Sequence, residues 1–127
     1  MNIIAINAES APAASGGYSQ ALEVQGAKRL LFISGQIPET QASSVPEGFP
    51  AQAKLVWKNV VAQLHAAGMS VSNLVKVTTF LSSREFAIAN REARYEALGK
   101  HAPALTVVIV GIFDEQWLLE IEAIAAE

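Results

Sequence analysis

The nine residues from Pro103 to Gly111, PALTVVIVG, decide the fold of this chain. They contain an apolar run, Leu105–Val110, which Pro103 and Gly111 bound on either side. A continuous run of this length is typical of a strand that is covered on both faces. The fold must therefore provide a layer on each side of this strand.

Outward from this strand, the sequence predicts further strands in the order ββ(β)αβαββ. They are expected at Asn2–Asn7, Ser19–Val24, Arg29–Ser34, Leu74–Leu81 and Leu118–Ala125. The second and third of these are predicted to form a hairpin around Gly26. Ala8–Gly17 and Gly35–Phe49 are rich in turn-forming residues and predict loops, the second of the long kind that often borders a site.

Two helices are predicted between the strands. The first begins at Pro50, which suits a first helical turn, and stops at Gly68. Its core-facing residues recur at spacings of three and four: Ala53, Val56, Trp57, Val60, Leu64 and Ala67. The second helix is expected to follow a capping box of Ser82 and Glu85 and to end at Gly99. Its core-facing seam is Phe86, Ala89, Ala93 and Ala97.

The composition indicates one domain, residues 1–127, that associates with copies of itself. Hydrophobic residues make up 51% of the chain and charged residues only 17%, against about 25% charged in average soluble domains. Two helices can cover only one face of the predicted sheet, so the other face needs a partner. We therefore expect a homo-oligomer in which sheets pack against sheets.

Several function classes are excluded or disfavoured. The chain has no cysteine, and its two histidines, His65 and His101, lack metal-ligand spacing, so neither a thiol nucleophile nor a metal site is expected. No phosphate-binding or dinucleotide motif is present, so no cofactor is expected. A net charge of −3 disfavours nucleic acid as a partner. No apolar run approaches a membrane span, so we expect no membrane partner and a cytoplasmic location.

Glu120 and Glu122 are the most notable polar residues, because they share one face of the otherwise apolar strand Leu118–Ala125. A carboxylate close to a sheet core is costly unless it is paired or used. From the residues alone, two interpretations remain open. The pair lies on a solvated edge, or at least one carboxylate belongs to a functional site.

Four blocks of sequence together resemble the signature of the RidA family, also called YjgF. The blocks are Gly17-Tyr18-Ser19-Gln20-Ala21, Phe32-Ile33-Ser34-Gly35-Gln36-Ile37-Pro38, Val75-Lys76-Val77-Thr78-Thr79-Phe80-Leu81 and Glu120-Ile121-Glu122-Ala123-Ile124-Ala125. The resemblance implies a chorismate-mutase-like α+β fold, with a six-stranded mixed sheet and two helices on one face. It further implies a homotrimer whose sheets enclose a central barrel, with small-molecule clefts between subunits.

The resemblance also implies a reaction and a site. Archetypal members hydrolyse enamines and imines to 2-keto acids and ammonia. The matching positions assign the catalytic role to Glu120, which could orient water and move protons. The cleft-lining positions are Tyr18, Ser34, Gly35, Asn90, Leu105, Thr106 and Val107.

Position 105 departs from the family pattern. Family deaminases carry Pro-Ala-Arg-Ser-x-Val before the penultimate strand, whereas this chain has leucine in place of the arginine that grips the substrate carboxylate. Loss of one partner of a desolvated ion pair costs about 2–5 kcal/mol, or roughly 30- to 4,000-fold in affinity. Standard deamination of 2-imino acids is therefore in doubt, and a less charged substrate is expected.

Three functions are weighed. The leading hypothesis is an imine or enamine deaminase-type hydrolase that acts on a substrate other than the usual 2-imino acids. The alternative is a non-catalytic trimer that binds or senses a small metabolite. A ribonuclease or translation-inhibitor role, by which some relatives are labelled, is less favoured because RNA binding needs a basic surface.

Overall fold

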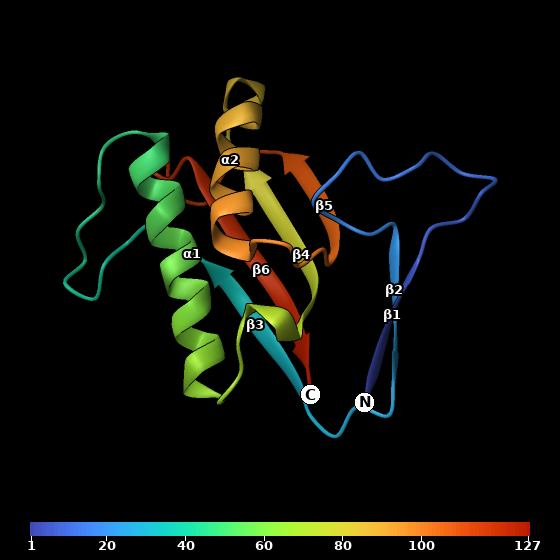
Figure 1. Cartoon of the computed structure of the whole chain (residues 1–127). Coiled ribbons are helices and arrows are strands. Elements are labelled where there is room, and N and C mark those ends of the chain that lie inside the picture. The colour runs from blue at the N-terminus through green and yellow to red at the C-terminus, as the bar shows by residue number, and fades with distance from the viewer.

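The computed structural model describes all 127 residues and has an α+β fold, as the sequence predicted (Figure 1). Two helices lie side by side against one face of a sheet. The strands are β1 (Asn2–Ile6), β2 (Ala21–Gln25), β3 (Leu30–Gln36), β4 (Leu74–Leu81), β5 (Ala104–Ile109) and β6 (Leu119–Ala126). The helices are α1 (Phe49–Ala66) and α2 (Ala87–Leu98), with short 3₁₀ turns at Val71–Asn73 and Arg84–Phe86.

The six strands are divided between two sheets. The main sheet has the order β3-β6-β4-β5, with β4 and β5 parallel and the other pairs antiparallel. Strands β1 and β2 form a separate antiparallel ribbon, which stands to one side of the main sheet in Figure 1. The mixed character of the sheet therefore comes from the single parallel pair at one edge.

The predicted hairpin around Gly26 is wrong. Strand β2 pairs with β1, and β3 pairs with β6 at the other end of the sequence. The reason lies in the link between them, where the N–H groups of Lys28 and Arg29 both donate to the carbonyl oxygen of Glu127. The Arg29 guanidinium also forms a salt bridge with the Glu127 carboxylate. The backbone contacts with Glu127 extend the pairing of β3 with β6 beyond the ends of both strands.

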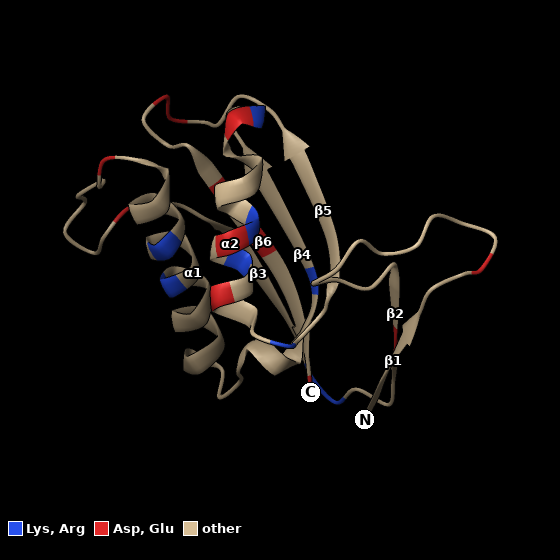
Figure 2. Ribbon diagram, turned by 45° about the horizontal axis from the view of Figure 1, so that its top comes forward, with Lys and Arg blue, Asp and Glu red and all other residues tan.

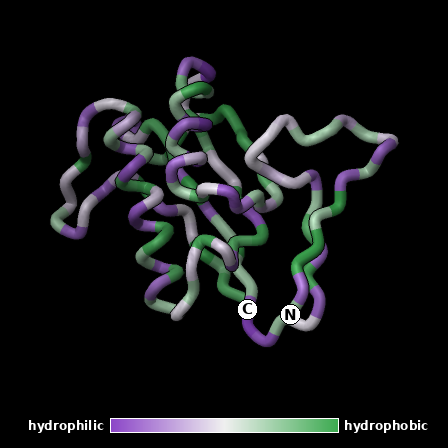
Figure 3. Tube along the Cα trace, viewed as in Figure 1, coloured by the Kyte–Doolittle hydropathy of each residue, from purple (hydrophilic) through white to green (hydrophobic).

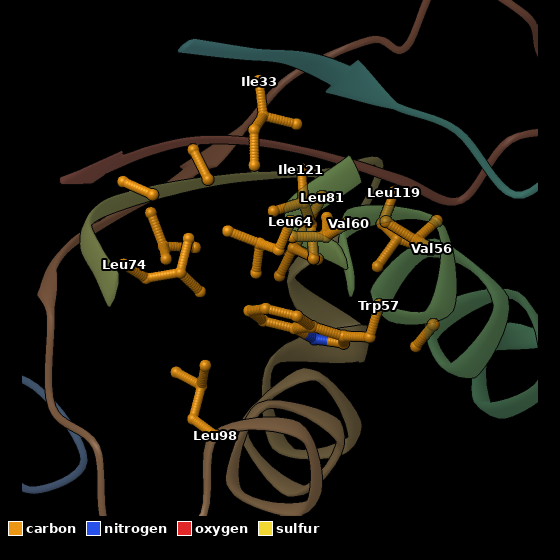
Figure 4. Close-up of a cluster of buried hydrophobic side chains, with 14 of the residues drawn as sticks. Ile33, Val56, Trp57, Val60, Leu64, Leu74, Leu81, Leu98, Leu119 and Ile121 are labelled. Atoms are coloured by element: carbon orange, nitrogen blue, oxygen red, sulfur yellow. The ribbon is translucent and has the colours of Figure 1, made fainter. Parts of the chain in front are cut away.

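The core lies between the helices and the main sheet (Figure 4). Helix α1 has a proline in its first turn and is followed by Gly68, which has a positive φ of 72°. Its predicted apolar side is buried, with Val56, Val60 and Leu64 fully enclosed. On β6 the predicted alternation is confirmed, because its inward-facing residues are buried: Leu119, Ile121, Ala123 and Ala125.

The predicted capping box at the start of the second helix is wrong by one residue. The side chain of Ser83, not Ser82, accepts a hydrogen bond from the backbone N–H of Glu85. Ser82 instead donates its backbone N–H to Leu118, which continues the β4–β6 pairing and delays the turn. A 3₁₀ turn follows, and α2 begins at Ala87.

The second face of the main sheet, which we call the open face, is covered by no part of the chain. Strand β5 lies at the edge of this sheet, and its open-face residue Thr106 is exposed. On the helix-covered face, the edge position leaves Val107 42% exposed and Ile109 37% exposed. The single chain therefore leaves one face uncovered, as expected for a sheet with both helices on the other face, and the coverage of this strand by a partner stays a prediction. Phe32 of β3 is 71% exposed.

Charge and hydropathy are distributed unevenly over the layers. Figure 2 shows acidic and basic residues concentrated on α2, whereas the strands of the main sheet carry few. Figure 3 shows hydrophobic residues along β5 and along the β1–β2 ribbon. Neither helix combines the length and the apolar character that crossing a membrane requires.

Candidate functional site

A cavity of about 380 Å³ lies between the loop before β2, the helix α2 and the edge strand β5. We call it the α2–β5 cavity. It brings together four of the residues that the sequence predicted for the site, namely Tyr18, Asn90, Leu105 and Val107. The remaining lining residues are Ser15, Gln20, Leu81, Ala87, Arg91 and Arg94. Its volume falls within the range of about 300–1,000 Å³ that is usual for small-molecule sites.

Tyr18 reaches this cavity because the chain around it is anchored on both sides. Gly17 has a positive φ of 74°, and a Cβ there would overlap the ring of Tyr95 on α2. On the other side, Ser19 donates its backbone N–H to Pro103 and its hydroxyl to the Ala102 carbonyl. The loop is thereby fastened beside the start of β5.

Asn90 and Arg94 enter the cavity from one side of α2, since residues four apart share a helix face. Both are almost completely buried, at 3% and 5% exposed. Arg94 was not among the predicted site residues, because the apolar residues alone defined the predicted inward side of this helix. The spacing of four from Asn90 was the signal that could have placed the arginine beside it.

One nitrogen of the Arg94 guanidinium is buried without a hydrogen-bond partner. Burial lowers the pKa of Arg94, and the neighbouring Tyr95 side chain acts in the opposite direction. The guanidinium carbon lies 5.4 Å from the centre of the Tyr95 ring, but its buried Nε has no hydrogen-bond partner. Arginine nevertheless keeps its charge in proteins, so the cavity contains a buried cation.

Tyr18 is perturbed as well. Its hydroxyl accepts the backbone N–H of Ser15 at 3.3 Å and lies 3.4 Å from the Ser15 hydroxyl. These contacts, followed by the charges of Arg94 and Arg91, lower the pKa of Tyr18. The phenol is thus a polar group at the cavity wall that is biased toward donating a proton or a hydrogen bond.

Glu120 lies on the opposite side of the main sheet. Leu105 and Val107 are paired with Val77 and Thr79 on the helix-covered face, whereas Glu120 is paired with Phe80 on the open face. Burial, and secondarily the neighbouring charge of Glu122, raises the pKa of Glu120. A carboxyl of this kind exchanges a proton closer to neutral pH than an ordinary glutamate does.

Gly35 and Glu120 are direct neighbours. The pairing of β3 with β6 shifts register between Ile33 and Gln36, and a Cβ at Gly35 would overlap the Glu120 carboxylate. The register shift and the missing side chain together make room for this carboxylate. The structure therefore brings these two predicted site residues into contact.

Ser34 and Thr106 belong to the open face rather than to the α2–β5 cavity. Ser34 lines a hollow of about 270 Å³ together with Lys76 and Glu122. The hydroxyl of Thr106 accepts a hydrogen bond of 2.7 Å from the Lys76 ammonium. Within one chain, the predicted site residues thus form two groups, one on each side of the sheet.

Comparison with known proteins identifies the family. The model of the Endoribonuclease L-PSP family matches residues 8–127. The chain is a member of this family, the RidA family. A RutC family protein of Pyrococcus horikoshii is 39% identical over 120 residues, covering 92% of each chain. The 2-iminobutanoate/2-iminopropanoate deaminase of Escherichia coli is 37% identical over 126 residues, covering 94% of each.

Solved structures of Rid proteins agree with this fold. YyfB of Yersinia pestis, described as a protein of unknown function of the conserved Rid family, superposes with a TM-score of 0.83 at 26% identity over the full length of both chains. TdcF of Escherichia coli with bound serine has a TM-score of 0.73 at 34% identity, covering 98% of each chain.

Proposed function

We propose that this RidA-family chain forms a homotrimer in which the open faces of three main sheets pack together. The support is the apolar surface that a monomer would leave in water. Leu30 and Phe32 are 58% and 71% exposed. Both belong to β3, an edge strand of the main sheet, and they share one face of it because they are two residues apart. Exposed apolar clusters of this kind are characteristic of interaction surfaces.

Small-molecule clefts between the subunits are the second part of this proposal. In one chain the α2–β5 cavity has Tyr18 and Asn90 but no carboxylate, whereas Glu120 faces the other side. A neighbouring subunit placed against the open face can bring its own residues to Glu120 and to the α2–β5 cavity. The bound serine in the related TdcF structure supports a site of small-molecule size.

The proposed reaction is the hydrolysis of an imine or enamine. Water adds to the carbon of the C=N bond, and the C–N bond then breaks to give a carbonyl compound and ammonia. Glu120 orients the water, accepts its proton and returns a proton to the departing nitrogen. The observation that carries this role is the Glu120 carboxyl, whose pKa is raised and which is held against Gly35.

The substrate proposed for this reaction is not one of the usual 2-imino acids. Leu105 lines the α2–β5 cavity at the position where the family resemblance calls for arginine, and a leucine side chain has no donor for a carboxylate. The deaminases among the relatives are named for 2-iminobutanoate and 2-iminopropanoate. We expect this chain to act slowly on both.

The test is the release of ammonia from imines generated in situ. A pyridoxal-phosphate dehydratase supplies the two 2-imino acids, and an amine oxidase supplies imines whose carboxylate is absent or distant from the imine carbon. We expect faster release from the second group and its loss in Glu120→Gln, with Glu122→Gln as the control. Release at the spontaneous rate from every imine would contradict the proposal.

A non-catalytic metabolite-binding trimer is the second candidate, and the observation that favours it is Leu105. An apolar side chain in the cavity removes a substrate contact but leaves the binding space. A metabolite retained through purification, found by mass spectrometry and not turned over, would select this function. The family's description also names a ribonuclease role. This role is less favoured, because a net charge of −3 disfavours the binding of RNA.

A further inference from the structure

A groove of about 470 Å³ lies between α1 and α2, and we call it the α1–α2 groove. Buried and half-buried apolar residues form its floor: Trp57, Val61, Ala89, Ala93 and Ala97. It shares no lining residue with the α2–β5 cavity. Because both helices lie against the same face of the main sheet, the groove opens on the side away from the open face. Packing of subunits through the open face would therefore leave the groove accessible.

The two rims of this groove carry opposite charges (Figure 2). Lys54 and Lys58 of α1 form one rim, and Glu92 and Glu96 of α2 form the other. All four residues are exposed. The members of each pair are four residues apart, so they lie on one side of their helix. The arginines of α2 line the α2–β5 cavity instead, so the charges of this helix are separated by sign.

The opposite charges do not pair across the groove. The one salt bridge of the structure joins Arg29 to Glu127, so no lysine of α1 forms an ion pair with a glutamate of α2. The axes of packed helices are about 8–10 Å apart, which leaves a gap between the rims that a small molecule can bridge. Within each rim, like charges at a spacing of four repel each other. A counter-charge supplied to each rim would offset this repulsion.

Trp57 adds an unsatisfied donor to the groove floor. It is only 4% exposed, and its indole Nε1 has no hydrogen-bond partner. Figure 4 shows the indole extending from α1, with its nitrogen on the side of α2. A buried donor without an acceptor costs free energy, so an acceptor that reached the floor would be bound favourably. A carboxylate bound by Lys54 and Lys58 is such an acceptor, because Trp57 lies between them in α1.

We propose that the α1–α2 groove binds a linear ω-amino carboxylate, a small zwitterion whose two charges stand at opposite ends of an aliphatic chain. Its carboxylate lies between Lys54 and Lys58 and accepts the indole N–H of Trp57. Its ammonium lies between Glu92 and Glu96, and its chain covers the apolar floor. An α-amino acid does not fit, because both of its charges are attached to one carbon and reach a single rim. The site is independent of the proposed hydrolase function, since it contains no residue of the proposed catalytic site.

The first test is calorimetric titration of the full-length wild type with four probes of the same chain length. They are 6-aminohexanoate, its isomer 2-aminohexanoate, hexanoate and hexylamine. We expect 6-aminohexanoate to bind at least about fivefold more tightly than each of the other three. The isomer has the same composition and net charge, so it isolates the separation of the charges. Equal binding of the isomer, or equal or tighter binding of hexanoate or hexylamine, would make the groove a simple apolar or single-charge surface and would overturn the proposal.

Reversal of the rims tests the recognition of charge. Lys54→Glu/Lys58→Glu and Glu92→Lys/Glu96→Lys should each weaken the binding of 6-aminohexanoate by at least about fivefold. The variant with all four substitutions should bind it at least about threefold more tightly than either double variant, because the zwitterion can enter in the opposite direction. Failure of this recovery in a variant that melts like the wild type would overturn the proposal.

Lys28→Glu/Lys100→Glu is the matched control for the lysine rim. It changes the net charge by the same amount, and both lysines are exposed and lie outside the groove. It should bind 6-aminohexanoate within about twofold of the wild type, since distant exposed charges are screened. A loss as large as that of Lys54→Glu/Lys58→Glu would mean that only the overall charge matters, and would overturn the proposal.

The indole of Trp57 provides a measurement that needs no substitution in the groove. The chain has two tryptophans, so Trp117→Phe leaves Trp57 as the source of the only indole N–H resonance. This resonance should shift on addition of 6-aminohexanoate and not of hexylamine, which has no acceptor. An unchanged resonance would overturn the placement of the carboxylate. A protein that binds the zwitterion but hydrolyses no imine would refute the hydrolase function and leave this site intact.

Discussion

Gly35 lies so close to the side chain of Glu120 that any larger residue at position 35 would overlap the carboxylate. The φ of Gly35 is not positive, so the constraint comes from this contact and not from backbone conformation. The register shift in β3 between Ile33 and Gln36 creates the space in which the two residues meet. The position of the carboxylate is therefore fixed by a glycine on the neighbouring strand.

Gly35→Ala should lower the free energy of unfolding by about 1–3 kcal/mol, because it forces the Glu120 side chain or strand β3 to move. Chemical denaturation measures this change. Gly111→Ala is the matched control, since a Cβ at Gly111 meets nothing within 4 Å and its φ is not positive. The double variant Gly35→Ala/Glu120→Ala should recover part of the loss. Additive effects of the two substitutions would show that the contact does not matter.

The raised pKa of Glu120 predicts a pH dependence of stability. Because the folded state holds this proton more tightly than the unfolded state, the unfolding free energy falls as pH rises from about 4.5, the ordinary value, through the raised pKa. Above the raised pKa, the unfolding free energy stays lower by the same amount, because Glu120 is then charged in both states. Glu120→Gln removes this titration, so the wild type should lose stability relative to the variant across that interval.

Urea denaturation of both proteins between about pH 4 and pH 7 measures the difference. Glu122→Gln controls for the removal of one negative charge from the same strand face. It should retain most of the pH dependence, because burial is the larger cause of the shift at Glu120. Parallel stability profiles for the wild type and Glu120→Gln would mean that the Glu120 carboxyl is as well solvated when folded as when unfolded.

Local patterns in the sequence were enough to predict the elements that depend on neighbouring residues. Strand β4 occupies the predicted Leu74–Leu81, and β6 buries the predicted side, because alternation reports burial directly. Helix α1 begins one residue before the predicted Pro50 and ends at Ala66, two residues before the predicted stop at Gly68. The family resemblance was confirmed by the match over residues 8–127.

Features that depend on distant residues could not be predicted in this way. The pairing of β3 with β6 joins segments from distant parts of the sequence, and Arg29 and Glu127, which meet beside it, are 98 positions apart. The assignment of Glu120 and Leu105 to opposite faces of the sheet follows from strand register, which the single sequence does not specify. The burial of Arg94 was not predicted, because only apolar residues were used to define the inward-facing side of α2.

The proposed trimer predicts that the wild type sediments at three times the chain mass at micromolar concentration. Phe32→Asp should weaken this assembly, since it places a charge within the apolar surface of the open face. Ile88→Asp is the control, because Ile88 is 73% exposed, close to the 71% of Phe32, but lies on α2 on the other side of the sheet. A stable wild-type monomer, or equal effects of both variants, would exclude packing through the open face.

Leu105→Arg tests whether a second buried cation in the α2–β5 cavity changes ligand binding and stability. The substitution places a planar donor at the position where the family resemblance calls for arginine, so it should confer or raise the binding of small 2-keto acids. The same guanidinium shares the cavity with Arg94, which already lacks an anionic partner. Without ligand, the variant should therefore melt below the wild type.

Thermal melting of Leu105→Arg with and without 2-ketobutyrate separates these two effects. A hundredfold excess of ligand over its dissociation constant stabilises the folded state by about 2.7 kcal/mol, so the variant should regain much of its loss while the wild type changes less. Leu105→Met, which keeps the length of the side chain without the charge, should show neither the loss nor the recovery. If Leu105→Arg melts like the wild type and responds to no keto acid, its guanidinium has turned to solvent. The cavity would then differ from the family cleft at more than position 105, and the transfer of the hydrolytic role to Glu120 would lose its basis.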